Sequence, residues 1–283
     1  MVTITDQLLI TNVFVLLIAA LLDYLIGDPI NWLHPVQVMG WVISRFTNIA
    51  LFLCKNALTQ RIAGIVLTIL LIFGTGAIST ILIKATLWIH PVLGIITKCI
   101  LLASCFAAKS LRSAAETVLE PLILEDIATA RLNIRQFVGR DTENLSKSEI
   151  LRAVLETVTE NATDAVMAPL FYAIVGIYIS AYIPIFEPVS LALAYKASST
   201  LDSMVGYKQQ PYTYLGWFSA RTEDVLTWVP CRLTVITLAI ISFKPLYVWN
   251  ICCRDAVLDP SPNSGWSECA YAAILGVQVG GTN

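Results

Sequence analysis

Residues 62–83 read IAGIVLTILLIFGTGAISTILI, a run of 22 residues without a charged side chain. A helix needs roughly 20 mostly apolar residues to cross the hydrocarbon core of a bilayer, so this run is long enough to span it. The composition of the whole chain agrees: 57% of its 283 residues are hydrophobic and 13% are charged, and the mean hydropathy is +0.72. A soluble domain carries about 25% charged residues. The sequence therefore indicates an integral membrane protein.

Further apolar stretches lie on both sides of this run. The expected membrane segments are residues 7–26, 62–83, 86–108, 166–195, broken at Pro184, Glu187 and Pro188, and 231–251, broken at Lys244-Pro245. The second and third segments predict a helical hairpin that turns near Lys84. Proline interrupts the hydrogen-bond ladder of a helix, and a carboxylate at membrane depth is costly. The last two segments are therefore expected to be bent or re-entrant helices, with ordinary crossings as the alternative. The predicted fold class is an all-α, polytopic membrane helical bundle that forms a single domain over residues 1–283.

The first segment is expected to be a retained anchor rather than a signal peptide, because Asp6 is the only charge before it. Residues 109–165 form the longest polar segment, with seven of the 18 basic and ten of the 20 acidic residues. Basic residues near membrane segments favour the cytoplasmic side, so this segment and 27–61, two crossings away, are expected there. Bent helices that return to this side would add the polar segments 196–230 and 252–283. The expected location is the cell membrane, with the functional site on its cytoplasmic face.

Several classes of protein are disfavoured by composition and motifs. The net charge of −2 argues against a nucleic-acid surface, which would need a basic excess. The seven cysteines contain no CxxC pair, and with only His34 and His90 in the chain a zinc site is not expected. Reduced, buried thiols are expected instead. The sequence also lacks the Walker A, GxSxG and HExxH patterns.

An acidic ladder lies on the most regular amphipathic helix of the polar segment. Ser146 and Glu149 predict a capping box that starts this helix, which is expected to run to about residue 166. Glu156, Glu160 and Asp164 then recur every four residues, where like charges repel by a few tenths of a kcal/mol per pair. The ladder is either a solvated outer face or a carboxylate site for Mg²⁺. Its continuation directly into an apolar run favours the magnesium site.

Three further clusters contain groups that suit phosphate. Lys196 and Lys208 flank Asp202 in one cluster, and Asp202 suits a metal ion or an amine. Arg221 precedes two acidic residues and is either a surface ion pair or a bidentate phosphate clamp. Residues 259–266 predict a rigid turn, with Ser264 as the expected cap of a following helix. This segment is either a plain surface turn or one that presents amide donors to an anion.

These clusters belong to a longer ordered series of motifs. The series consists of DYLIGDP (23–29), HPV (34–36), ETVTEN (156–161), DAV (164–166), APLFY (168–172), YK (195–196), TLDSMVGYK (200–208), GWFSAR (216–221) and SPNSG (261–265). Over nearly the whole chain it resembles the CobD/CbiB family of cobalamin biosynthesis, the adenosylcobinamide-phosphate synthases. One departure is that the sequence stops at residues 280–283, where members usually continue.

The resemblance implies an ATP-dependent amide ligation. A propionate carboxylate of adenosylcobyrate is joined to (R)-1-amino-2-propanol phosphate, or a related amino-alcohol phosphate, which gives adenosylcobinamide phosphate. Implied partners are the corrinoid and amino-alcohol phosphate substrates, the lipid bilayer and other cobalamin-pathway enzymes, with ATP and Mg²⁺ as cofactors. Two rival functions are a transporter or sensor that binds a phosphorylated or corrinoid ligand, and a hydrolase that uses Glu156 and Glu160 with a metal-bound water.

The roles of individual residues are a hypothesis built on this chemistry, in which magnesium and cationic side chains neutralise phosphate. The candidate catalytic residues are Asp202, Glu160 and Lys208; the candidate ATP- and phosphate-binding residues are Lys196, Arg221, Asn161, Asn263 and Ser261; the candidate magnesium ligands are Glu156, Glu160 and Asp164. All of them are expected to meet at one site beside the inner leaflet.

Overall fold

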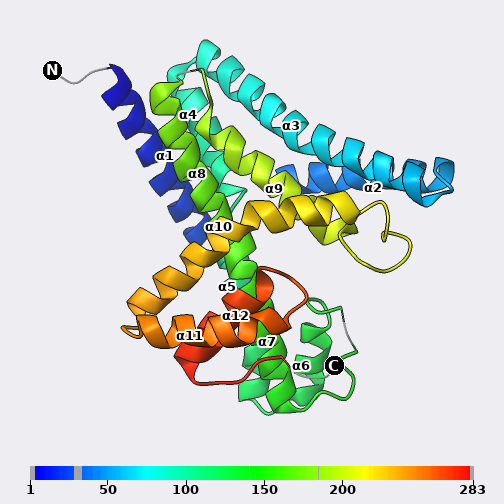
Figure 1. Ribbon diagram of the computed structural model, residues 1–283. Coiled ribbons are helices and arrows are strands. Elements are labelled where there is room, and N and C mark those ends of the chain that lie inside the picture. The colour runs from blue at the N-terminus through cyan, green and yellow to red at the C-terminus, as the bar shows by residue number, and fades with distance from the viewer. Residues whose placement is uncertain (1–3, 29–33, 140, 184, 281–283) are drawn as a thin grey trace. The chain divides into compact units, whose positions relative to one another are not determined.

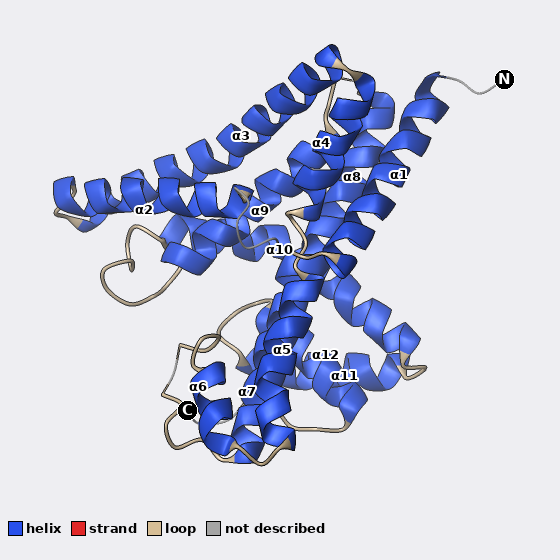
Figure 2. Cartoon of the chain, turned by 180° about the vertical axis from the view of Figure 1, so that it is seen from behind, coloured by secondary structure: helices blue, strands red, loops and turns tan. Residues whose placement is uncertain are grey.

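The computed structural model describes residues 4–28, 34–139, 141–183 and 185–280. Within these ranges every regular element is a helix, which confirms the all-α fold class (Figures 1 and 2). Six helical segments of the described part are long and apolar enough to cross a bilayer. The chain is therefore a multi-pass membrane protein. Pro29 of the 23–29 motif, Pro184 of the broken segment 166–195 and residues 281–283 lie outside the described ranges.

The helices divide into two compact units. Unit 1 is formed by residues 1–107 and 168–226 and unit 2 by residues 108–167 and 227–283. Unit 1 contains α1 (Ile4–Leu25), α2 (Pro35–Leu53), α3 (Ala57–Ile89), α4 (Pro91–Ala103), α8 (Ala168–Tyr182), α9 (Pro188–Val205) and the beginning of α10 (Trp217–Ile241). Unit 2 contains α5 (Ala108–Ile123), α6 (Ile127–Ile134), α7 (Lys147–Ala162), the π-helix η1 (Thr163–Met167), the rest of α10, α11 (Pro245–Asp255), the 3-10 helix η2 (Ala256–Leu258) and α12 (Ser264–Leu275).

Two histidine-proline pairs set helix starts in unit 1. His34 and His90 each accept a hydrogen bond at Nδ1 from the backbone amide two residues later, and a proline follows each as the first helical residue. Proline suits this position because its missing amide would be unpaired there anyway. The hairpin turn predicted near Lys84 was wrong: α3 continues to Ile89, and the break comes at His90. A lysine can extend its stem along apolar surface, whereas a proline inside the helix would break the ladder.

Two other boundaries differ from the sequence prediction. Helix α2 is apolar enough to span a bilayer, although it lies within residues 27–61, which were expected on the cytoplasmic side and not as a membrane segment. Helix α10 begins at Trp217, inside the segment predicted to be polar, and runs through Pro230. The expected breaks before Pro188 and at Lys244-Pro245 are confirmed, because α9 and α11 begin at these prolines.

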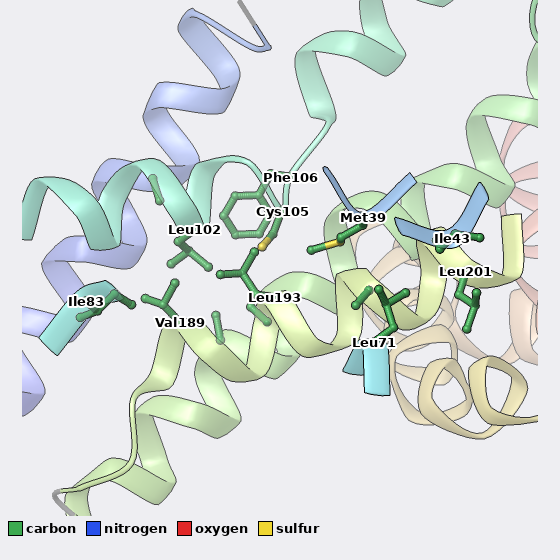
Figure 3. Close-up of a cluster of buried hydrophobic side chains, with 14 of the residues drawn as sticks. Met39, Ile43, Leu71, Ile83, Leu102, Cys105, Phe106, Val189, Leu193 and Leu201 are labelled. Carbon is green, nitrogen blue, oxygen red and sulfur yellow. The ribbon is translucent and has the colours of Figure 1, made fainter. Parts of the chain in front are cut away.

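Helix α9 forms the centre of unit 1, where it packs against α2, α3, α4 and α8. Figure 3 shows its side chains Val189, Leu193 and Leu201 among residues of α2, α3 and α4 and of the segment that follows α4. The hydrophobic cluster continues through Met39, Ile43, Leu71, Ile83, Leu102, Cys105 and Phe106. Eleven of the 18 residues of α9 are buried, so its position is fixed along most of its length.

Unit 2 has two smaller hydrophobic clusters. Helices α5, α6 and α7 share one cluster, made of Val118, Leu122, Ala130, Ile134, Ile150, Ala153 and Val154. Helices α10, α11 and α12 share the other, made of Val235, Ala239, Val248, Cys252, Ala270 and Ala273. All seven cysteines of the chain are free. The expectation that they are buried is confirmed for Cys99, Cys105, Cys231 and Cys252, but it was wrong for Cys253, which is exposed, and for Cys54 and Cys269, which are partly exposed.

Candidate functional site

The polar end of α9 and the loop that follows it carry the candidate residues of unit 1. The amide of Gly206 closes the helix by donating to the Asp202 carbonyl at 2.7 Å. A Cβ on Gly206 would lie 2.6 Å from this carbonyl oxygen and would overlap the Asp202 carboxylate. At the other end of the loop, a Cβ on Gly216 would overlap the carbonyl oxygen of Val205. The two glycines therefore let the loop fold back onto the end of α9.

Two carboxylates from different helices influence each other at this end of unit 1. Burial raises the pKa of the Asp202 carboxyl to about 6, and the Asp224 carboxylate on α10 adds to this rise. Burial disfavours the charged form of an acid, and a second negative charge disfavours it further. The pair therefore combines a poorly solvated carboxylate with a neighbour of the same sign.

Cationic side chains surround the second carboxylate. The Nη1 atom of Arg221 lies 3.7 Å from Oδ2 of Asp224, and 70% of the Arg221 side chain is exposed. Lys208, in the loop, also interacts electrostatically with Asp224. The structure thus brings together Asp202, Lys208 and Arg221, three of the predicted residues, around Asp224. We refer to these four residues as the α9–α10 cluster.

Sequence reasoning missed the contribution of Asp224 and Glu223, which it treated only as ion-pair partners of Arg221. Glu223 is buried, with 8% of its surface exposed, and interacts electrostatically with Tyr172 of α8. Tyr172 donates its hydroxyl to the Leu226 carbonyl at 2.9 Å and stacks on Tyr195 of α9, with 4.9 Å between ring centroids. The helices α8, α9 and α10 are consecutive in the chain, but no sequence signal showed which of their side chains would meet here.

Lys196 is a partly buried residue in the middle of α9. It lies six positions before Asp202, which places the two side chains about 120° apart around the helix axis. Lys196 interacts electrostatically with the buried Cys105, which follows α4. Within unit 1, Lys196 therefore lies near the end of α4.

In unit 2, the capping box predicted at the start of α7 is confirmed. The Ser146 amide donates to Glu149 Oε2 at 2.7 Å, and the Glu149 amide donates back to Ser146 Oγ. Two turns further on, Glu156 binds the chain near its C-terminal end: the Gly280 amide donates to Glu156 Oε1 at 2.9 Å. Arg152 donates to the Gly280 carbonyl at 3.0 Å. This predicted magnesium ligand thus holds a backbone segment in place.

The acidic ladder does not continue with helical regularity. The α-helix ends at Ala162 instead of near residue 166, and Asp164 lies in the π-helix η1. A π-helix holds more residues per turn, so Asp164 is shifted from the line through Glu156 and Glu160. No group of three or more His, Cys, Asp or Glu residues in the described ranges is arranged to hold a metal ion. The assignment of Glu156, Glu160 and Asp164 as magnesium ligands stays a prediction.

The π-helix forms where α10 and α12 approach this segment with polar side chains. Thr163 shares a 3.0 Å hydrogen bond with Ser267 of α12 and donates to Thr234 of α10 at 3.4 Å. Ser267 donates in turn to the Thr159 carbonyl at 2.6 Å. All four side chains are buried. These partners satisfy polar groups where regular helical bonding is interrupted, and Asn161 bonds within its own helix, to the Thr157 carbonyl.

The turn before α12 is built by its own side chains. Asp259 accepts from the Ser261 amide at 2.7 Å, and the hydroxyl of Ser261 accepts from the Asn263 amide at 3.2 Å. The expectation that Ser264 caps α12 was wrong: it is the first residue of the helix. Asn263 instead accepts from Arg232, whose guanidinium lies 4.7 Å from each of two tryptophan ring centroids, those of Trp228 and Trp266.

The predicted residues therefore divide between the units. Asp202, Lys208, Arg221 and Lys196 belong to unit 1, and Glu156, Glu160, Asp164, Asn161, Ser261 and Asn263 belong to unit 2. The expectation that all of them meet at one site stays a prediction.

One family model and several known proteins match this chain over most of its length. Residues 16–283 match the family described as CobD/Cbib protein. The chain belongs to the CobD/CbiB family. The cobalamin biosynthesis protein CobD of Synechocystis sp. is 53% identical over 265 residues, which cover 94% of this chain and 76% of the relative. CobD of Halalkalibacterium halodurans is 41% identical, with 96% and 82% covered, and CbiB of Salmonella typhimurium is 38% identical, with 94% and 81% covered. No solved structure matches.

The α9–α10 cluster gives this CobD/CbiB member two chemical capacities. Lys208 and Arg221 can bind phosphate oxygens, and the guanidinium of Arg221 can do so through two parallel hydrogen bonds. Asp202, with a pKa of about 6, is mostly ionised at neutral pH and still accepts a proton more readily than an ordinary aspartate. A cluster with both capacities suits chemistry on a phosphorylated substrate.

Proposed function

We propose that this CobD/CbiB member, an adenosylcobinamide-phosphate synthase by family, uses ATP to join adenosylcobyrate to (R)-1-amino-2-propanol phosphate or a related amino-alcohol phosphate. The observation that carries the proposal is the α9–α10 cluster, in which Lys208 and Arg221 surround the Asp202–Asp224 pair. Membership of the family supports a role in cobalamin biosynthesis, and the cluster contains groups that the proposed reaction needs. We further propose that this cluster faces the cytoplasm, where ATP is available.

The reaction makes an amide from a carboxylate and an amine. The corrinoid carboxylate oxygen must first take a phosphoryl or adenylyl group from ATP, because an oxide is too poor a leaving group for an amine to displace. The amine nitrogen then attacks the carbonyl carbon, the activated oxygen leaves with its phosphate, and the nitrogen loses a proton. Lys208 and Arg221 would hold phosphate groups in position during these steps, which rely mainly on positioning and charge neutralisation.

This part of the chain has carboxylates that suit the Mg²⁺ ion bound to ATP. Mg²⁺ commonly uses one or two protein carboxylates together with substrate phosphates, and Asp202 and Asp224 form such a pair. The ion would neutralise phosphate charge when bound. Glu156, Glu160 and Asp164 are a second proposed carboxylate set, on unit 2. Asp202 is proposed either as a metal ligand or as the base that receives the amine proton.

Both roles of Asp202 require its ionised form, so pH provides a test. Because the pKa is about 6, kcat/KM should fall as pH drops through 6, and Asp202→Asn should remove this step together with most of the activity. Stability should respond in the opposite direction. A pKa raised above the unfolded value of 3.8 means that this group stabilises the fold most below about pH 4 and loses this contribution by about pH 6.

The decisive assay uses protein purified in detergent with adenosylcobyrate, the amino-alcohol phosphate, ATP and Mg²⁺, and measures adenosylcobinamide phosphate by chromatography. Asp202→Asn, Lys208→Ala and Glu160→Gln should each lower kcat/KM at least about 100-fold, as expected when a positioned charge is lost. Lys244→Ala, at the exposed start of α11, is the control and should keep normal activity. Near-normal turnover in all three folded variants would refute the site assignment.

A growth test separates this enzyme from a transporter or sensor. A strain that lacks the chain should grow when given cobinamide but not when given cobyric acid, because only the second compound requires the ligation. Corrinoid binding without ATP-dependent product in the purified protein would contradict the proposed function.

A further inference from the structure

Arg61, near the start of α3, lies against two aromatic rings of the α9–α10 connection. Its guanidinium carbon is 5.7 Å from the centroid of the Tyr214 ring and 5.3 Å from that of the Trp217 ring. Its side chain is exposed. Among the residues that the structure describes, Arg61 makes no hydrogen bond or ion pair. Aromatic contacts of this kind use the faces of the guanidinium and leave its N–H edge available for an anion.

The backbone around Arg61 is fixed by close packing. One turn further along α3, the Leu215 carbonyl approaches Gly64 so closely that a Cβ on Gly64 would overlap the carbonyl oxygen. A Cβ on Gly216 would overlap the Val205 carbonyl at the end of α9. The loop is therefore held against α3 on one side and against α9 on the other. Arg61 is in this way positioned relative to both helices.

The same loop and helix carry the two cations of the α9–α10 cluster. Trp217 and Arg221 are four residues apart on α10 and thus on one face of the helix, one turn apart. Tyr214 follows Thr213, whose hydroxyl donates to the Lys208 carbonyl at 2.9 Å. Trp217 therefore lies one turn from Arg221, and the residue before Tyr214 is bonded to the backbone of Lys208. Arg221 has Asp224 as a partner at 3.7 Å, whereas Arg61 has no such carboxylate in the described part of the chain.

We propose that Arg61 is a third phosphate-binding residue of the α9–α10 cluster. Its ligand is a phosphate group, either of ATP or of the amino-alcohol phosphate. This identity of the ligand rests on the proposed function. A guanidinium held by two rings loses little conformational freedom when it binds, and its planar edge matches two phosphate oxygens. The residue acts in binding and touches no reacting atom.

The test compares Arg61→Met, which keeps an apolar stem but removes the charge, with Arg61→Lys, which keeps the charge but not the planar fork. Lys55→Met is the matched control, because Lys55 also lies over one ring, that of Phe52 at 5.3 Å, just before the start of α3. The Kd of ATP and the Kd of the amino-alcohol phosphate are measured separately by calorimetry in detergent, and KM and kcat are measured for the ligation.

Arg61→Met should raise the Kd and KM of one phosphate substrate by about 10-fold or more, the loss typical of a charge-assisted hydrogen bond. The kcat should change much less, Arg61→Lys should lie between Arg61→Met and the parent protein, and Lys55→Met should match the parent. A rise confined to ATP identifies the nucleotide as the ligand, and a rise confined to the other substrate identifies the amino-alcohol phosphate. Unchanged Kd values for both substrates in folded Arg61→Met overturn the proposal.

Binding and turnover keep the two proposals separable. If the parent protein binds a phosphate substrate but makes no product, the proposed function fails, while the Kd comparison still decides the role of Arg61. If the parent binds neither substrate, the role of Arg61 is refuted as well. If Arg61→Met does not fold, Arg61→Lys decides the question, and equal Kd values for Arg61→Lys and the parent then count against the proposed planar contact.

Discussion

Helices α3 and α9 of unit 1 pack against each other, and the less hydrophobic of the two is the more buried. Helix α3 is the more apolar, yet six of its 33 residues are buried. Helix α9 carries Lys196, Asp202 and several hydroxyl side chains, and eleven of its 18 residues are buried. The more polar helix forms the centre of the unit, and the apolar helix presents most of its surface outwards, where lipid covers it in a membrane.

The difference follows from the solvent. Lipid tails are about as apolar as leucine, so an apolar side chain gains little by leaving lipid for the protein interior. Polar groups at membrane depth do need partners. Ser190 of α9 supplies an example, because its hydroxyl is 2.9 Å from that of Ser79 and 2.8 Å from that of Thr80, both on α3. Polar contacts and small residues therefore decide which helix is central.

The buried ion pair at the start of α9 offers the strongest test of this view. Lys98 of α4 lies 3.0 Å from Glu187, the residue before Pro188, and each side chain is 7% exposed. Lys98→Met alone leaves a buried carboxylate without its cation and should lower the free energy of unfolding by about 3–5 kcal/mol. Lys98→Met combined with Glu187→Met should recover most of this loss. Unfolding by SDS titration in mixed micelles measures both, and a double variant as unstable as the single one would contradict the explanation.

Truncation of matched leucines compares the two helices directly. Leu193 of α9 is 2% exposed, whereas Leu70 of α3 is 61% exposed. Leu193→Ala should lower the free energy of unfolding by about 2–5 kcal/mol because it leaves a cavity. Leu70→Ala should change it by about 0.5 kcal/mol or less, since only lipid or detergent contacts are lost. The same titration measures both variants, and equal losses would show that α3 is not a lipid-facing helix.

Two glycines of α3 provide the finest comparison. A Cβ on Gly64 would overlap the Leu215 carbonyl, whereas a Cβ on Gly74 has no neighbour within 4 Å. Gly64→Ala should destabilise the protein by about 1–3 kcal/mol, the usual range for forced overpacking. Gly74→Ala should be neutral or stabilising by up to about 1 kcal/mol, because alanine favours the helix. Thermal unfolding followed by circular dichroism distinguishes them, and a neutral Gly64→Ala would mean that the loop is not seated on α3.

Much of the site was visible in the sequence as types of residue but not as an arrangement. Asp202, Lys208 and Arg221 were expected to act together, and the structure groups them around Asp224. Lys196 belongs to the same polar stretch as Asp202, but helical geometry turns it towards Cys105. Asp164 fitted the periodicity of an α-helix, and the π-helix, formed where Thr163 meets Thr234 and Ser267, shifted it. Contacts between distant segments leave no local trace in the chain.

The sequence by itself determined that the chain is helical and enters a membrane, because uncharged runs of this length have no stable place in water and must satisfy their backbone internally. It also determined several helix starts, through the local chemistry of proline and the Ser146 capping box. Only the tertiary structure decided that α9 is central, that Arg61 lies over Tyr214 and Trp217, and that Asp202 has Asp224 as a neighbour. Hydropathy measures the cost of contact with water, whereas these choices depend on which polar groups and small residues meet.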